Sequence, residues 1–461
     1  MKSYKITNHF KITFLFILGS FFITVLLTSN YLDKFDNYKS YQNENDHPMI
    51  KTAVNNHWGE ANKIINDYKS GKTFFESGSN SADEFLPQKI LAFYFLITSK
   101  EMYENNLIKT NNGKLFYLSL KSLFYFFLIF IFFLKFRKFF SENVIFPIII
   151  YLSCLPDLIQ YHLSFWNESF TFIFQIILIF FLIDFKFSIK KNFLLGMVAA
   201  LPYLTGQEYL FYFIVFIFYY LFIFLYYKKK TFKFLVSFII GYSVVLSLVL
   251  FLNHFKTGQN NLNLYGLKSA LYIYIVPEIL ANKNNTTHAQ SISNMKKDAI
   301  IWANKNEINF VKSKNLLLEI KENNFRDKIK YNNYMLIYSL KTIFSNLHHV
   351  IYLHFKKSMH MLVLNPFFID NFYKYETIGS FLKSEKHFDL IKYRVVYSLF
   401  FYLILFYGFY KSLLFYKPEL IFLLVLLISY NILILGLLGS PRYFAPAILY
   451  MSLFFGPIFK K

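Results

Sequence analysis

The sequence has few of the residues that cross-link a chain or separate its domains. Its one cysteine, Cys154, cannot form an internal disulfide, and a thiolate metal cluster is excluded for the same reason. No Gly/Ser-rich linker and no internal repeat marks off a separate soluble domain. Arginine is also scarce, since it occurs only at positions 137, 326, 394 and 442.

Apolar and aromatic side chains are abundant instead. Hydrophobic residues make up 55% of the 461 positions and aromatic residues 22%. Apolar runs near twenty residues recur, and a helix of that length crosses the hydrocarbon core of a bilayer. The formal net charge of +22 could indicate nucleic-acid binding, but the basic residues cluster at the ends of apolar runs, as membrane orientation requires. We therefore predict an all-α polytopic membrane protein that contacts membrane lipids and no nucleic acid.

The apolar runs predict about ten transmembrane helices. The first is preceded by Lys2, Lys5 and Lys11 and lacks a small-x-small cleavage site, which favours an uncleaved span over a signal peptide. The fifth is short and contains Pro202, so a tilt or a break is expected there. The predicted spans are 13–27, 116–134, 143–159, 166–184, 192–206, 208–227, 234–253, 394–410, 418–438 and 441–457.

The short connections between these spans alternate in charge. The connections around 157–167, 205–208 and 439–442 contain one cation, Arg442. By the positive-inside rule the basic connections and both termini are cytoplasmic. The basic connections carry Lys135, Arg137, Lys138, Lys186, Lys190, Lys191, Lys228, Lys229, Lys230, Lys233, Lys411 and Lys417.

This orientation divides the chain into three parts. Residues 1–253 form an N-terminal transmembrane module that includes an outer loop, 30–115; residues 254–392 form an outer helical region; and residues 393–461 form C-terminal transmembrane helices. Helical patterns are expected in the outer region at 312–321 and 331–364. The second pattern has apolar faces interrupted by four histidines and is typical of a helix on a membrane surface.

Four charged residues fall on the outward side at one level. Asp46, Glu168, Glu208 and Arg442 each lie at a predicted membrane boundary, where unpaired charge is expensive and tends to be functional. Structural roles compete with this interpretation, because acids at helix starts cap helices or favour their dipoles, and Arg442 could bind lipid headgroups. A fixed planar guanidinium also suits phosphate or pyrophosphate.

Several short motifs occur in order along nearly the whole chain. Asp46 follows the first span, the helical pattern containing Ala53 ends at Gly71, and a Leu-Pro step follows at 86–87. Three later motifs complete the set. They are an acid at the start of the fourth span, polar residues at the end of the seventh span, and an Arg-Tyr-x-x-Pro motif near the C-terminus. These later positions are Pro156, Glu168, Asn253, Gly258, Arg442, Tyr443 and Pro446.

In these motifs the chain resembles the GT-C superfold of integral-membrane glycosyltransferases, especially bacterial relatives of dolichyl-phosphate-mannose protein mannosyltransferases and of lipid A aminoarabinose transferase. The resemblance implies a polyprenyl-phosphate-linked sugar donor, a lipid, glycan or protein acceptor, and a bacterial inner membrane. The chain departs from the family at Asp46–His47, where two acids are usual, and at Gly206–Gln207, where an Arg is usual.

The resemblance also assigns site residues. Asp46 is expected to be the general base, with Glu60 as the competing candidate; Glu168 and Glu208 are candidates for a second acid that orients the acceptor or holds a metal. Arg442 and Tyr443 would bind the donor phosphate. A divalent cation, Mg²⁺ or Mn²⁺, is left open because relatives differ in requiring one.

Two other classes compete with the glycosyltransferase. A polysaccharide polymerase or O-antigen ligase would have many spans and a large outer loop rich in Arg and His, whereas residues 254–392 contain only Arg326 and a His cluster. A lipid or glycan transporter would have internal repeats or charges near the bilayer midplane, and the middles of the predicted spans are nearly free of charge.

Overall fold

A computed structural model describes most of the chain. The described residues are 8–37, 60–78, 85–98, 111–162, 168–183, 187–228, 231–257, 271–311, 318–320, 325–364, 385–435 and 444–460. The chain divides into two compact units. Unit 1 contains Met1–Leu262, Leu362–Asn431 and Phe444–Lys461, and unit 2 contains Asn263–Met361 and Ile432–Tyr443. The predicted three-part division of the chain stays a prediction.

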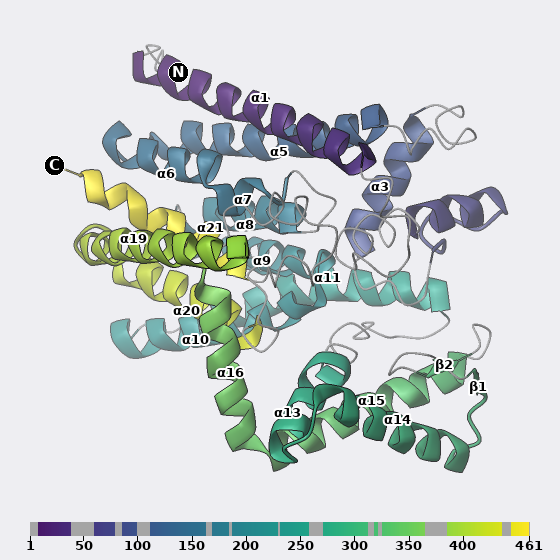
Figure 1. The fold of residues 1–461 in the computed structure, drawn as a ribbon. Coiled ribbons are helices and arrows are strands. Elements are labelled where there is room, and N and C mark those ends of the chain that lie inside the picture. The colour runs from purple at the N-terminus through teal and green to yellow at the C-terminus, as the bar shows by residue number, and fades with distance from the viewer. Residues whose placement is uncertain are drawn as a thin grey trace. The chain divides into compact units, whose positions relative to one another are not determined.

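Unit 1 is a helical bundle (Figure 1). Its first helix, α1 (Asn8–Asn37), packs along α5 (Asn111–Phe136), and α9 (Ile189–Ala200) packs along α11 (Phe232–Thr257). The remaining elements are a helical stretch at 60–69, α3 (Phe85–Ile97), α6 (Glu142–Cys154), α7 (Pro156–Ile159), α8 (Glu168–Ile183), η3 (Leu201–Leu204), η4 (Gln207–Phe211), α10 (Tyr212–Tyr227), α19 (Glu385–Phe415), α20 (Pro418–Leu435), α21 (Ala445–Phe455) and η8 (Gly456–Phe459).

The described helices are consistent with an all-α membrane protein. Among the described residues, five helices are long and apolar enough to cross a bilayer: Phe10–Ser29, Leu115–Phe136, Glu208–Tyr227, Phe232–Leu252 and Tyr393–Phe415. Five shorter apolar helices accompany them, and the full count of ten spans stays a prediction. At the fifth predicted span, α9 ends at Ala200 and the chain continues as the 3-10 turn η3, which contains Pro202.

Glycines set the closest helix crossings in unit 1. A Cβ on Gly196 of α9 would lie 2.1 Å from the Phe238 carbonyl oxygen of α11, and a Cβ on Gly241 of α11 would lie 2.0 Å from the Phe193 carbonyl oxygen. The two backbones therefore touch where a side chain would hold them apart. Small residues at such crossings supply dispersion contacts between membrane helices, which lack a hydrophobic driving force in lipid.

One end of unit 1 collects the basic residues. Lys135 of α5 donates to the Phe180 carbonyl of α8 at 2.9 Å, Ser237 of α11 donates to the Ile189 carbonyl of α9 at 2.7 Å, and Tyr227 donates to Glu419 at 2.5 Å. These contacts join the C-terminal ends of α5 and α8, the N-terminal ends of α9 and α11, and the end of α10 to the start of α20. We call this the basic end; it carries Lys135, Arg137, Lys138, Lys190, Lys191, Lys228, Lys233, Lys411, Lys417 and Lys460.

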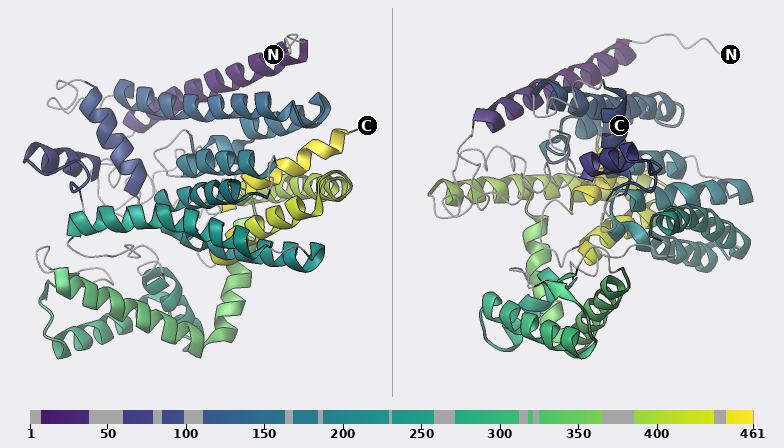
Figure 2. Two further views of the ribbon diagram at one scale, coloured as in Figure 1. Left: turned by 180° about the vertical axis from the view of Figure 1, so that it is seen from behind. Right: turned by 90° about the vertical axis from the view of Figure 1, so that its right-hand side faces the viewer.

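Unit 2 is a smaller helical body (Figure 2). It has its own cluster of buried apolar side chains. Met295 and Ala299 of α14 pack against Tyr331 and Met335 of α15. The expected helix at 312–321 is wrong over its C-terminal part, because Glu319–Ile320 pairs with Phe310–Val311 as an antiparallel ladder. The elements are η5 (Leu271–Ile275), α13 (Val276–Lys283), α14 (His288–Lys305), β1 (Phe310–Val311), β2 (Glu319–Ile320), α15 (Phe325–Ser345) and α16 (Leu347–Leu362).

Candidate functional site

The predicted site residues fall partly outside the described chain. Asp46, Arg442 and Tyr443 lie outside the described residues, so their predicted roles stay predictions. Glu60, Glu168 and Glu208 are described, and all three belong to unit 1.

Glu168 lies near a buried lysine. It is the first residue of α8, its side chain is buried, and it interacts electrostatically with Lys121 of α5, which is buried as well. The Lys121 ammonium donates to the Tyr161 carbonyl at 3.5 Å and lies 5.9 Å from the centre of the Phe170 ring. Lys121 is inside the span Leu115–Phe136, where a charged side chain is costly and therefore points to a function or a specific partner.

His162 borders this pair in the turn after α7. Its side chain is fully buried, and its ring lies 4.0 Å from the Tyr125 ring and 6.0 Å from the Phe172 ring. Burial, and secondarily the positive charge of Lys121, lowers the pKa of His162 well below its ordinary value. The imidazole is therefore neutral at physiological pH, and its two nitrogens have no hydrogen-bond partner among the described residues.

A second buried carboxylate, Asp157, lies on the same connection as His162. Asp157 is in the first turn of α7 and accepts a hydrogen bond from the Tyr397 hydroxyl of α19 at 3.0 Å. Arg394, one turn earlier on α19, interacts electrostatically with the same carboxylate. Asp157 therefore joins the connection between α6 and α8 to the N-terminal part of α19.

Glu208 lies in η4 at the start of α10. Its carboxylate folds back over Gly206, because a Cβ on Gly206 would lie 2.4 Å from Glu208 Oε1. Its backbone carbonyl accepts a hydrogen bond from the Tyr430 hydroxyl of α20. The glycine at position 206 thus makes room for the Glu208 carboxylate.

These acids share one end of unit 1. The Thr171 and Thr205 hydroxyls are 2.7 Å apart and join the start of α8 to the end of η3, while Lys121 reaches the turn after α7. We call this the carboxylate end and define it by Asp157, Glu168 and Glu208. Deeper in the bundle, the Gln175 and Asn431 amides each donate to the Tyr212 hydroxyl at 3.3 Å, which provides polar contacts between α8, α20 and α10.

Glu60 begins the helical stretch at 60–69, which packs against the same part of unit 1. Ala61, Ile64 and Ile65 share a buried cluster with Tyr117 and Leu118 of α5, and Phe170 of α8 packs against that cluster. Tyr117 is one turn before Lys121, and Phe170 is two residues after Glu168. The competing candidate base is therefore on a helix that contacts both elements carrying the buried pair.

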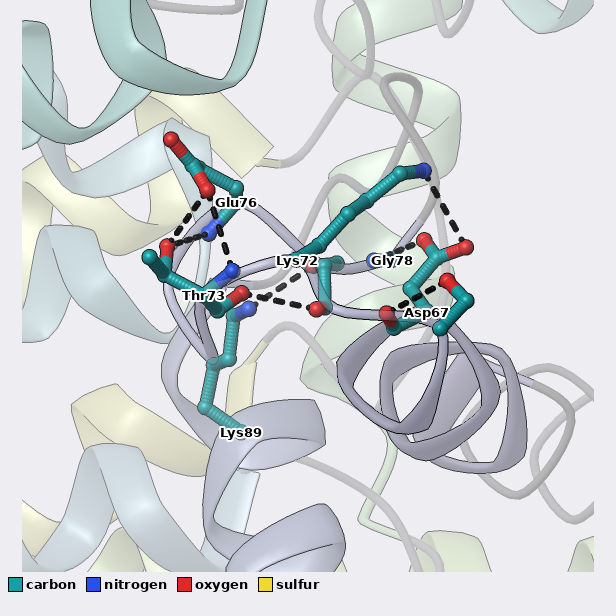
Figure 3. A network of polar contacts seen from close by, with 8 residues as sticks. Asp67, Lys72, Thr73, Glu76, Gly78 and Lys89 are labelled. Atoms are coloured by element: carbon teal, nitrogen blue, oxygen red, sulfur yellow. Dashed lines mark hydrogen bonds and ion pairs between the residues drawn. The ribbon is translucent and has the colours of Figure 1, made fainter.

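The loop after that helix is fixed by a polar network (Figure 3). The buried Lys89 ammonium donates to the Ser77 carbonyl at 2.8 Å, and the Asp67 carboxylate accepts from Gly78 N–H at 2.9 Å and pairs with Lys72 at 3.2 Å. Burial alone would raise the pKa of Asp67, but the contacts with Gly78 and Lys72 lower it overall. Gly71 and Gly78 have φ values of 98° and 102°, which favour glycine at these turns.

The divalent cation suggested by the resemblance has no complete ligand set in the described part of the chain. There, no three His, Cys, Asp or Glu side chains lie close enough together to hold one metal ion.

Sequence reasoning missed Lys121, Asp157 and His162 as individual site residues. Lys121 interrupts an apolar run at a predicted span, and a lone charge in such a run is a signal that could have identified it. Asp157 and His162 lie in the connection between α6 and α8, where the sequence patterns single out Glu168 alone.

Comparison of the chain with family models, with curated proteins and with solved structures finds no match.

Proposed function

We propose that the protein is an integral-membrane glycosyltransferase of the GT-C type, which transfers a sugar from a polyprenyl-phosphate donor to a lipid, glycan or protein acceptor. The observation that carries this proposal is the gathering of three acids from two connections at one end of unit 1, with buried Lys121 beside one of them. The order of the motifs between Asp46 and Pro446 supports the same class.

Location and orientation are part of the proposal. The basic end faces the cytoplasm with both termini, and the carboxylate end faces the opposite side of a bacterial inner membrane. A polyprenyl-phosphate donor then reaches the carboxylate end laterally from the outer leaflet, with its phosphate at the level of the headgroups.

In the proposed reaction a carboxylate acts as general base. Asp46, with Glu60 as the alternative, accepts the proton of the acceptor hydroxyl while that oxygen attacks the anomeric carbon. The bond from this carbon to the phosphate oxygen breaks, and its electron pair leaves with the polyprenyl phosphate, so the configuration at the anomeric carbon inverts. Arg442 and Tyr443 stabilise the charge that grows on the phosphate.

The second acids would hold the acceptor in place. Glu168, kept in its position by Lys121, and Glu208, held over Gly206, are the candidates that accept hydrogen bonds from acceptor hydroxyls. Asp157 positions the start of α19 through Tyr397.

The test is replacement of the candidate bases in cells that produce the protein. Asp46→Asn and Glu60→Gln are compared with Glu76→Gln, a matched change of an exposed acid that binds Thr73 in the same outer loop. We expect one of the first two variants, at normal protein level, to lose the glycan or lipid product while polyprenyl-phosphate sugar accumulates, as measured by mass spectrometry. Normal product from both variants, and from the double variant, would contradict the proposal.

A further inference from the structure

Helix α16 has one covered face and one open apolar face. On the covered face, Val350 and Leu353 pack against Ile275 and Ile279 of unit 2. The open face carries Leu347, Ile351, Phe355 and Met359, whose exposed fractions are 51%, 68%, 69% and 52%. These residues are four apart, so they form a stripe along a single side of the helix. Exposed apolar area of this extent marks an interaction surface.

The charges on this helix are of one sign. Its sequence contains Lys356 and Lys357 and has no acidic residue, and the last turns of α15, from Ile337 to Ser345, contain Lys341 and no acid. Lys341 and Lys356 are exposed, whereas Lys357 forms an ion pair with Glu278 at 2.7 Å. Lys356 directly follows Phe355 of the stripe, and an apolar face accompanied by exposed lysines is complementary to a layer of anionic lipid headgroups.

The C-terminal end of α16 meets a membrane span. The Leu362 carbonyl accepts a hydrogen bond from the Tyr402 hydroxyl at 2.7 Å, and Leu364 N–H donates to the Ser398 hydroxyl at 2.9 Å. Ser398 and Tyr402 both lie in the span Tyr393–Phe415, whose Phe400 and Leu403 are exposed as a lipid-facing surface would be. Leu362, the last residue of α16, and Leu364 therefore belong to unit 1 and are hydrogen-bonded to a helix that is long and apolar enough to cross a membrane.

We propose that the open face of α16, formed by Leu347, Ile351, Phe355 and Met359, lies in the interfacial layer of an anionic bilayer and attaches unit 2 to the membrane surface. The apolar side chains occupy the upper acyl region, and Lys341 and Lys356 contact lipid phosphates. Other occupants of the face, a partner protein or a second copy of the chain, are outcomes that the experiment separates.

Cys154 is the only cysteine, so a Cys154→Ser background allows single nitroxide labels in the full chain. Labels are placed by Phe355→Cys on the stripe, Phe400→Cys on the α19 span and Ile301→Cys on α14. Ile301 is 66% exposed in unit 2 but lies outside the stripe, which makes it a matched control. The protein is reconstituted into vesicles of phosphatidylethanolamine and phosphatidylglycerol, and collision with oxygen and with a water-soluble nickel chelate is measured by power saturation.

We expect the ratio of oxygen to nickel accessibility at position 355 to match that at 400 and to exceed that at 301 several-fold. Nickel access at 355 equal to that at 301 would place the face in water and overturn the proposal. A label reached by neither reagent would show that protein covers the face, which also overturns it. Ile351→Cys repeats the measurement should the Phe355 variant fail to fold. Replacing Lys341 and Lys356 by Gln is expected to lower the ratio, and an unchanged ratio would overturn the role assigned to these lysines.

Discussion

The basic end and the carboxylate end of unit 1 hold their charged residues in opposite settings. At the basic end Lys138, Lys190 and Lys233 are exposed, and the described cations there are nowhere fully buried. At the carboxylate end Lys121, Asp157 and Glu168 are only 5%, 3% and 6% exposed. Exposed charge costs little and sets which way the helices face, whereas buried charge must be matched by specific partners.

The difference separates orientation from chemistry. Loss of one exposed lysine removes one of many similar positive charges. The remaining lysines still provide the excess of positive charge that orients the helices in the membrane. Loss of one buried partner changes the environment of an individual carboxylate, whose state decides whether it can hold or accept a proton. The effects of mutations on stability should therefore be larger at the carboxylate end than at the basic end, and they should depend on the individual partner that is lost.

The largest effect is expected from the buried pair. Lys121→Met removes the cation with which Glu168 interacts and should reduce the stability of the folded state by about 3 kcal/mol, because it leaves a buried carboxylate without that charge. The measurement is thermal unfolding in detergent, with Lys138→Met at the basic end as control. The double variant Lys121→Met, Glu168→Gln should recover much of the loss. Equal destabilisation by the single and the double variant would contradict a coupled pair.

A smaller effect is expected from His162 and depends on pH. Its pKa is lowered in the folded state, so as pH falls below the ordinary value of 6.5 the unfolded chain binds a proton that the folded chain does not. The contribution of His162 to the free energy of unfolding is therefore fully present above pH 6.5. Below pH 6.5 it is lost by about 1.4 kcal/mol for each pH unit.

The check is the unfolding temperature of wild type and His162→Phe at about pH 7.5 and pH 5.5. Phenylalanine fills a similar volume against Tyr125, and neither histidine nitrogen has a hydrogen-bond partner among the described residues. The variant should fold and should lose part of the acid sensitivity. An identical pH dependence in both proteins would show that the pKa of His162 is not lowered in the folded state, and it would contradict the prediction.

Much of the fold could be predicted from the sequence, because apolar length alone identifies a membrane helix. The break at Pro202 and the gathering of lysines at a single end follow from patterns that are local in the chain. The carboxylate end depends on contacts between distant segments, such as Tyr397 with Asp157 and Lys121 with Glu168, and periodicity carries no information on them. The strand at Glu319–Ile320 was missed because its pairing with Phe310–Val311 overrides a helical pattern.

The smallest effect is expected at the basic end. Replacing Lys190 and Lys233 by Gln should change the unfolding free energy by less than about 0.5 kcal/mol, because both side chains are exposed. Topology should also hold, since Lys138, Lys228 and Lys417 remain on the same side. The orientation is measured with Lys460→Cys in a Cys154→Ser background. Reaction of this cysteine with a membrane-impermeant maleimide shows on which side of the membrane the C-terminus lies. Destabilisation as large as that of Lys121→Met would mean that these lysines are also held by specific partners, and the contrast between the two ends would fail.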